Sequence, residues 1–151
     1  MDTYADPDAM LRLDNQLCFA VYACSREIIK LYHPHLKELG LTYTQYITML
    51  VLWEHPTLSA KELGNALYLD SGTLTPLLKK LERLGFIERR RGTEDERSLI
   101  VSLTQKGEEL KEAAREIPSK VACGLKMPAH EAVFLRESLK DLIRRIHTCG
   151  E

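Results

Sequence analysis

The sequence predicts a mainly α-helical protein that carries one small β-hairpin. Over most of the 151 residues, apolar side chains recur at the i, i+3, i+4, i+7 spacing of a helix with one buried face. Two segments, 86–91 and 99–103, have strand character and are joined by a polar stretch. With 44% hydrophobic and 28% charged residues, a chain of this length can bury a core and is not expected to be disordered.

Each expected helix has a local signal at one of its ends. Thr42 and Ser59 each precede a Gln or Glu by three residues, which is the capping-box pattern of a helix start. Pro34 disfavours helical geometry in the residue before it, so the first helix should end near His33. Pro118 should bend the fifth helix. We therefore expect helices at 11–33, 43–54, 59–66, 70–84, 106–126 and 129–147.

This order of elements predicts a winged helix-turn-helix. The helices 59–66 and 70–84 are separated by a few residues, like the two helices of that DNA-binding motif, and the hairpin would form the wing. The terminal helices carry more apolar surface than so small a middle needs, so they should pack against a second copy in a homodimer. We expect an N-terminal region for dimerisation and sensing at 11–42, a DNA-binding domain at 43–103 and dimerisation helices at 104–149.

The helix 70–84 has an apolar face and a polar face. The apolar face comprises Leu74, Leu77, Leu78, Leu81 and Leu84, and the polar face carries hydroxyls on Ser71, Thr73 and Thr75 and cations on Lys79, Lys80 and Arg83. Hydroxyl groups can hydrogen-bond to base edges in the major groove, whereas Lys and Arg bind phosphates. The polar face therefore predicts a recognition helix.

Positive charge gathers where this helix runs into the first strand. Between residues 70 and 91 there are six Lys or Arg residues against three Asp or Glu residues, in a chain of net charge −1. A local basic patch is typical of a sequence-reading DNA binder, and Arg89, Arg90 and Arg91 would add phosphate contacts. The alternative for this run is a solvated strand edge that discourages pairing. The expected partner is double-stranded DNA with a pseudo-palindromic operator.

Other classes of protein have little support. No apolar run is long enough to span a bilayer, and the N-terminus lacks the basic region of a signal peptide, so we expect a cytoplasmic protein without a membrane partner. The four cysteines form no C-x-x-C pair and, in a reducing compartment, no disulfide framework. The five histidines are scattered. We expect no metal, no cofactor and no enzymatic active site.

The chain resembles the MarR family of transcriptional regulators over nearly its whole length. The strongest matches are Leu63-Gly64, the segment 69–79 and the wing segment Asp95-Glu96-Arg97-Ser98. The resemblance implies that Asp95 holds the hairpin by an ion pair with Arg97. It also implies that Arg97 reaches the minor groove of DNA.

Within that family the chain is similar to the OhrR-type repressors, which sense organic hydroperoxides. The segment 14–19 matches the signature around their reactive cysteine, here Cys18, and Tyr32 and Tyr43 match tyrosines that surround the thiol. Cys123 corresponds to the resolving cysteine of the two-cysteine members. The resemblance implies that oxidised Cys18 forms a disulfide with Cys123 of the partner subunit.

A sensing role for Cys18 requires a stabilised thiolate and access for the oxidant. Tyr22 lies one helical turn away on the same face and can donate a hydrogen bond to a thiolate. A hydroperoxide would convert the thiolate to a sulfenic acid, which condenses with a second thiol to a disulfide. The alternative is that Cys18 and Tyr22 are only packing residues. Cys24 is expected to be packed and Cys149 to lie in a frayed tail, and either of them, or a small thiol, is an alternative resolving group.

The sequence therefore predicts a repressor that leaves its operator when Cys18 is oxidised, because an intersubunit disulfide would change the spacing of the two recognition helices. One alternative is a MarR-type regulator that senses a small phenolic or quinone ligand or a general redox signal. A thiol peroxidase is less favoured, since the sequence offers no obvious histidine or arginine activator near Cys18.

Overall fold

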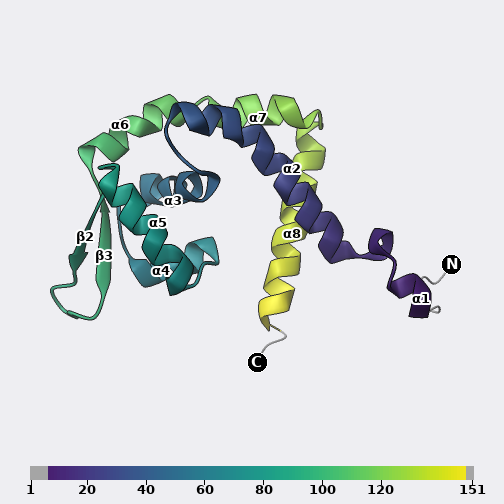
Figure 1. Ribbon diagram of the computed structural model, residues 1–151, viewed down its shortest axis with the longest axis horizontal. Coiled ribbons are helices and arrows are strands. Elements are labelled where there is room, and N and C mark those ends of the chain that lie inside the picture. Colours follow the sequence, from purple (N-terminus) through teal and green to yellow (C-terminus); the bar gives the residue numbers. More distant parts are fainter. Residues whose placement is uncertain (1–6, 149–151) are drawn as a thin grey trace. The chain divides into compact units, whose positions relative to one another are not determined.

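The computed structural model describes residues 7–148 and has two compact units, one up to Ile117 and one from Pro118 (Figure 1). The first unit contains α1 (Pro7–Met10), the 3-10 turn η1 (Leu13–Asn15), α2 (Leu17–Glu38), α3 (Tyr43–Glu54), β1 (Thr57–Ser59), α4 (Ala60–Leu67), α5 (Ser71–Arg83), β2 (Ile87–Arg91), β3 (Leu99–Leu103) and α6 (Gln105–Ala114). α7 (Ile117–Leu125) begins at the boundary, and α8 (Ala129–Thr148) completes the second unit. The expected class, mainly helical with a winged helix-turn-helix, is confirmed.

The sheet has three strands rather than the two expected. Its order is β1-β3-β2 with antiparallel pairing throughout, and Val101 of β3 lies opposite Leu58 on one side and Arg89 on the other. β1 is three residues long and its last residue, Ser59, is also the N-cap of α4. A strand of three residues is too short to show an alternating pattern in the sequence, so only its pairing with β3 identifies it.

The first long helix does not end before Pro34, as expected, but continues to Glu38. Proline removes one hydrogen bond from the helix interior. The last turn is retained because it buries Leu36, whose side chain is 2% exposed. The helix ends in a Schellman motif, in which the Leu41 amide donates to the Leu36 carbonyl at 3.0 Å and Gly40 takes the left-handed φ of 69°.

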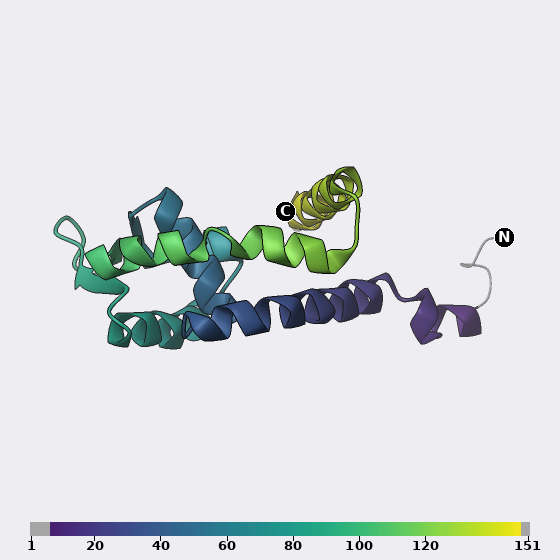
Figure 2. The ribbon, with the colours of Figure 1, turned by 90° about the horizontal axis from the view of Figure 1, so that it is seen from above.

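The N-terminal half of α2 projects away from the cluster of α3, α4 and α5 in both views (Figures 1 and 2). The expected helix start at residue 11 is wrong, because the extended backbone of Gln16 separates η1 from a helix that begins at Leu17. Large apolar side chains in this half of the helix are exposed, and Leu17 is 63% exposed in the single chain. This surface is therefore available to a partner.

The expected helix 106–126 is two helices, α6 and α7. The break precedes Pro118, which occupies the second position of α7. In the first turn of a helix the N–H that proline lacks has no intrahelical acceptor, so Pro118 is compatible with a helix start and does not bend a continuous helix. Thr104 caps α6 by accepting a hydrogen bond from the Gly107 amide at 3.0 Å.

The core of the first unit lies among α3, α4, α5 and β3. Its most buried side chains, each at most 1% exposed, include Met49, Leu52, Leu63, Leu78, Leu81 and Val101. Both expected capping boxes are formed, by Thr42 at α3 and by Ser59 at α4. The Trp53 indole donates to the Gly107 carbonyl at 2.9 Å and so joins α3 to the start of α6. The recognition helix thus stands on a well-packed base.

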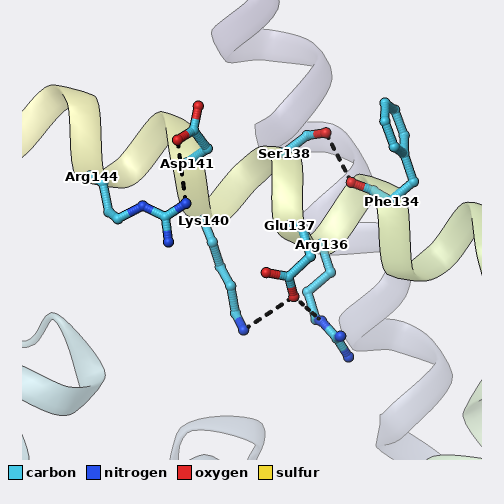
Figure 3. Close-up of polar contacts among 7 residues, drawn as sticks. All are labelled: Phe134, Arg136, Glu137, Ser138, Lys140, Asp141 and Arg144. Carbon is cyan, nitrogen blue, oxygen red and sulfur yellow. Dashed lines mark hydrogen bonds and ion pairs between the residues drawn. The ribbon is translucent and has the colours of Figure 1, made fainter.

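In the second unit, α8 is amphipathic. Figure 3 shows Glu137 between Arg136 and Lys140, at 2.9 and 3.3 Å, while the ring of Phe134 points to the other side of the helix. Phe134 is 75% exposed.

None of the helices within residues 7–148 is long and apolar enough to cross a membrane.

Candidate functional site

The recognition helix α5 buries the face that its periodicity predicts. Leu74, Leu77, Leu78 and Leu81 are buried, and Leu84 is half-buried at the helix end. The opposite face is open to solvent, with all six predicted DNA-contacting side chains of this helix exposed: Ser71, Thr73, Thr75, Lys79, Lys80 and Arg83. The helix can therefore enter a groove without any change in its own packing.

The start of α5 fixes the hydroxyl groups. Asp70 is the N-cap, and its carboxylate accepts a hydrogen bond from the Thr73 amide at 2.8 Å and another from the Thr73 hydroxyl at 3.2 Å. The bond from the amide, followed by that from the hydroxyl, lowers the pKa of Asp70. The Thr75 hydroxyl donates to the Ser71 carbonyl at 2.8 Å. Both threonine oxygens therefore present lone pairs outward, which suits the amino groups of bases in the major groove.

The tip of the wing is held by backbone contacts of Asp95. Its carboxylate accepts from the Arg97 amide at 2.9 Å, and its carbonyl accepts from the Ser98 hydroxyl at 2.7 Å. The ion pair expected between the side chains of Asp95 and Arg97 is not seen among the described residues, because the carboxylate engages the backbone instead. The side chain of Arg97 is exposed.

The three arginines of β2 lie in different surroundings. Arg90 and Arg91 are exposed. Arg89 has a side chain only 19% exposed and is paired with Glu82 of α5 at 2.7 Å. The hydrogen bond from Arg89 is the largest cause that lowers the pKa of Glu82. Sequence reasoning missed Glu82, because the partners lie on different elements and are separated by a turn.

Cys18 is exposed at the second position of α2. Tyr22 follows one turn later and is 57% exposed. Its oxygen accepts a hydrogen bond from Arg26 at 3.0 Å, and the guanidinium carbon lies 5.4 Å from the ring centroid. Because Arg26 uses a lone pair of the phenol, the Tyr22 proton stays available to another acceptor. Arg26 was not predicted, although its spacing of four from Tyr22 is a sequence signal.

Tyr32 and Tyr43 pack edge to face with ring centroids 5.1 Å apart, and both rings also lie against Tyr46. Burial raises the pKa of Tyr32 and Tyr43, and burial together with its two neighbours raises that of Tyr46 to about 12. All three hydroxyls are therefore proton donors at neutral pH.

The fold of one chain does not bring these tyrosines to Cys18. Cys18 and Tyr32 lie 14 positions apart on the same helix, which at 1.5 Å per residue is about 21 Å along its axis. Tyr43 is in contact with Tyr32 and is correspondingly distant. Only Tyr22, among the three predicted tyrosines, is near Cys18 in the same chain.

The other cysteines fall in different places. Cys24 is exposed in the N-terminal half of α2, so the expectation that it is packed is wrong for the single chain. Cys123 is exposed on α7. Cys149 lies outside the described residues. Within the described part of the chain, no group of three or more His, Cys, Asp or Glu side chains could hold a metal ion.

Comparison with known proteins relates most of the chain to transcriptional regulators. A family model described as transcriptional regulator SarA/Rot matches residues 30–114. The organic hydroperoxide resistance transcriptional regulator of Bacillus subtilis is 48% identical over 137 residues, which are 91% of this chain and 93% of that protein. The regulator SarZ of Staphylococcus saprophyticus is 46% identical over 133 residues, covering 88% of this chain and 91% of the relative.

Solved structures agree with these relatives. Reduced AbfR bound to DNA superimposes with a TM-score of 0.77 at 37% identity, over 93% of this chain and 99% of that one. The disulfide-formed AbfR superimposes with a TM-score of 0.64 at 39% identity, over 90% and 96%. A further structure is that of AbfR of Staphylococcus epidermidis, with a TM-score of 0.76 at 36% identity over 93% and 97%.

A winged helix-turn-helix with an exposed hydroxyl and cation face defines a transcriptional regulator of the DNA-binding class. The chain belongs to the SarA/Rot family of MarR-like transcriptional regulators, and its expected kinship with the OhrR-type regulators is confirmed.

Proposed function

We propose that this chain forms a homodimeric repressor that leaves its operator when an organic hydroperoxide oxidises Cys18. The observation that carries the proposal is the position of Cys18, which is exposed in the first turn of a helix that projects from a DNA-binding body. The N–H groups of a first turn lack intrahelical acceptors and favour negative charge nearby. The names of the relatives, which include an organic hydroperoxide resistance regulator, support the same sensing role.

The proposed oxidation is a two-step reaction at sulfur. The Cys18 thiolate attacks the outer oxygen of the hydroperoxide, the O–O bond breaks, and the remaining alkoxide takes a proton to leave as an alcohol. Cys18 then holds a sulfenic acid. A second thiol attacks that sulfur, an S–S bond forms, and the oxygen leaves as water. The hydroperoxide accepts the two electrons that the two thiols lose in forming the disulfide, so this reaction requires no cofactor.

A second subunit completes the sensing site. Because Tyr32 lies about 21 Å along the helix from Cys18 of its own chain, Tyr32 and Tyr43 act on the Cys18 of the partner subunit. Their raised pKa values keep them as donors to the thiolate or the sulfenate. The exposed apolar side chains of the α2 region and of α8, such as Leu11, Leu17 and Phe134, supply a dimer interface.

The DNA-binding surface of the proposed dimer uses α5 and the wing. Ser71, Thr73 and Thr75 read base edges, and the exposed cations of α5 bind phosphates. Arg90, Arg91 and Arg97 extend the contact to the wing. Solved relatives bound to DNA, such as reduced AbfR, support this surface.

We propose Cys123 of the partner subunit as the resolving thiol. Its exposure on α7 supports this assignment, and one relative, AbfR, has been solved in a disulfide-formed state. Cys24 is the matched alternative because it is exposed as well. Disulfide formation would alter the separation of the two recognition helices and so release the operator.

The deciding experiment is a gel shift with an operator selected in vitro from random double-stranded DNA by the reduced protein, using reduced protein and protein treated with cumene hydroperoxide. We expect release of DNA by the wild type, retention by Cys18→Ser, and a dimer-sized band on non-reducing electrophoresis that Cys123→Ser removes but Cys24→Ser retains. If peroxide still releases the Cys18→Ser protein from DNA, the proposal is contradicted and the alternative of a general redox signal, sensed by another group, is favoured. Catalytic rather than stoichiometric consumption of peroxide would point to a peroxidase.

A further inference from the structure

The recognition helix and the wing are joined by a single carboxylate. Glu82, in the last turn of α5, accepts three hydrogen bonds from Arg89 of β2. The Arg89 side chain donates to Oε2 from Nε at 3.2 Å and from a terminal nitrogen at 2.7 Å, and its backbone amide donates to Oε1 at 3.2 Å. The Glu82 carboxylate therefore binds both the side chain and the backbone amide of Arg89.

This contact differs from six other ion pairs seen within residues 7–148. Those pairs join residues one to four positions apart on a single helix and are more than 40% exposed on both sides. Glu82 and Arg89 are seven positions apart on two elements, and their side chains are 38% and 19% exposed. A carboxylate that accepts three hydrogen bonds from one half-buried arginine fixes geometry in a way that a single contact between two exposed side chains does not.

The chain between the two residues reverses direction over a short turn. Gly85 takes a left-handed φ of 80° there, and its carbonyl accepts a hydrogen bond from the Thr104 hydroxyl at 2.6 Å. Glu82 and Arg89 close this turn from the other side. On β2, Arg89 lies opposite Val101 of β3, so the contact also anchors the hairpin whose far end carries Arg97.

The ion pair with Glu82 distinguishes Arg89 from the two arginines that follow it on β2. The Arg89 charge is balanced by Glu82, whereas Arg90 and Arg91 are exposed and remain available to phosphates. An arginine that is already engaged by a carboxylate through two side-chain nitrogens has fewer donors left for DNA.

We infer that Glu82 and Arg89 are positioning residues for DNA binding, which set the wing against α5 so that both can contact one operator half-site together. Arg89 acts through this pairing and does not bind a phosphate. The inference rests on the DNA-binding part of the proposed function. It does not depend on the oxidation of Cys18.

The test compares the salt dependence of operator binding for four reduced proteins: wild type, Glu82→Ala, Arg89→Met and Arg90→Met. A lost phosphate contact flattens the slope of log K against log salt by about 1. We expect Arg90→Met to show this change. We expect Arg89→Met to bind roughly tenfold more weakly with the slope of the wild type, as for the loss of a coupled pair.

Glu82→Ala is the sharper variant, because it removes a negative charge from a DNA-binding surface. Simple electrostatics predicts tighter binding, whereas loss of positioning predicts binding that is weaker by roughly tenfold. The double variant Glu82→Ala/Arg89→Met should be no weaker than either single variant, since both disrupt one contact. Arg89→Lys, which keeps the charge but loses the planar fork, should also weaken binding at an unchanged slope.

A flattened slope for Arg89→Met, equal to that of Arg90→Met, would overturn the inference, and so would unchanged or tighter binding by Glu82→Ala. Circular dichroism establishes that each variant is folded. If Arg89→Met fails to fold, Arg89→Lys and Glu82→Ala decide the question. A wild-type protein that does not bind operator DNA would instead contradict the proposed function itself.

Discussion

The Lys106 ammonium donates a hydrogen bond to the Leu84 carbonyl at 2.7 Å and lies 5.1 Å from the centroid of the Phe86 ring. A side chain of α6 therefore caps the C-terminal end of the recognition helix. Cations at a helix C-terminus satisfy carbonyls that have no intrahelical partner and interact well with the helix dipole. The contact links the recognition helix to the element that leads out of the winged helix.

Replacing Lys106 by methionine should remove this cap while keeping most of the aliphatic stem. We expect a loss of about 1 kcal/mol in the free energy of unfolding, in the range of an exposed cap with a cation–π contact. Urea denaturation followed by far-ultraviolet circular dichroism measures the change. Lys61→Met, at an exposed position of α4, is the control. An equal change in both variants would show that the cap contributes nothing specific.

Gly107→Ala should destabilise the first unit by about 2 kcal/mol, because the added methyl group would overlap the Phe86 carbonyl and approach the Leu103 side chain to 2.8 Å. Relief would require the start of α6 to move away from Phe86 and Leu103, which would disturb the bond from Trp53 to Gly107. Trp53 is the one tryptophan of the chain, so its fluorescence should shift in the folded variant and report the unfolding midpoint. A variant with wild-type stability and an unchanged spectrum would contradict this packing.

Asp70 should make the start of α5 sensitive to acid. Its pKa in the folded protein lies below the ordinary value of 3.8 because the Thr73 amide and hydroxyl donate to it. Its stabilising contribution is therefore complete above the unfolded pKa and is lost as the pH falls through the folded one. Asp70→Asn keeps a capping oxygen that does not titrate. The stability advantage of the wild type over this variant should be constant from pH 7 to pH 5 and shrink below about pH 4, as measured by urea unfolding. A difference that stays constant to low pH would exclude this linkage.

Tyr32→Phe should slow the oxidation of Cys18 without changing the DNA affinity of the reduced protein. Loss of one hydrogen bond to the thiolate corresponds to about 1 kcal/mol, or roughly a fivefold slower reaction. The rate is read from the decay of DNA-bound fluorescence anisotropy after cumene hydroperoxide is added. Tyr46→Phe is the matched control, since Tyr46 is in the same aromatic cluster but only 2% exposed. Equal oxidation rates for Tyr32→Phe and the wild type would show that Tyr32 takes no part in the proposed sensing site.

Thr73 and Lys79 should affect DNA binding in different ways. Lys79→Met should weaken binding to all sequences and flatten the salt slope by about 1, because it removes a phosphate contact. Thr73→Ala should leave the slope unchanged and alter the preference at one base pair of each half-site. Binding to a set of operators with single base-pair changes separates the two effects. Uniform losses from both substitutions would show that neither residue reads a base.

Features that depend only on residues close together in the sequence were predicted correctly. The capping boxes of Thr42 and Ser59 need only residues three positions apart, and both are formed. The apolar spacing of α5 gave its buried face, and the strand 99–103 was placed correctly. Each of these signals lies within a single element, where side-chain spacing alone decides the outcome.

Features that depend on distant partners were missed. The strand β1 exists through its pairing with β3, some 40 residues later. Pro34 stays helical because the turn that follows it buries Leu36, which the sequence around the proline does not reveal. The engagement of Arg89 by Glu82 depends on the geometry of the turn at Gly85. The pairing of Cys18 with Cys123 stays a prediction.

The continuity of α2 through Pro34 gives the molecule a long rigid lever arm. From Cys18 to the helix end at Glu38 the rise is about 30 Å, and the helix ends in the Schellman motif at Gly40, two residues before the N-cap of α3. A tilt of about 5° at this pivot displaces the sulfur by roughly 3 Å, which is comparable to the Cβ–Cβ span of a disulfide. Conversely, a pull of a few ångströms on the thiol reaches the tyrosine cluster only as a small rotation. A force applied at Cys18 would therefore reach the residues near the pivot as a smaller displacement but a larger force, which is the mechanical advantage of a long arm.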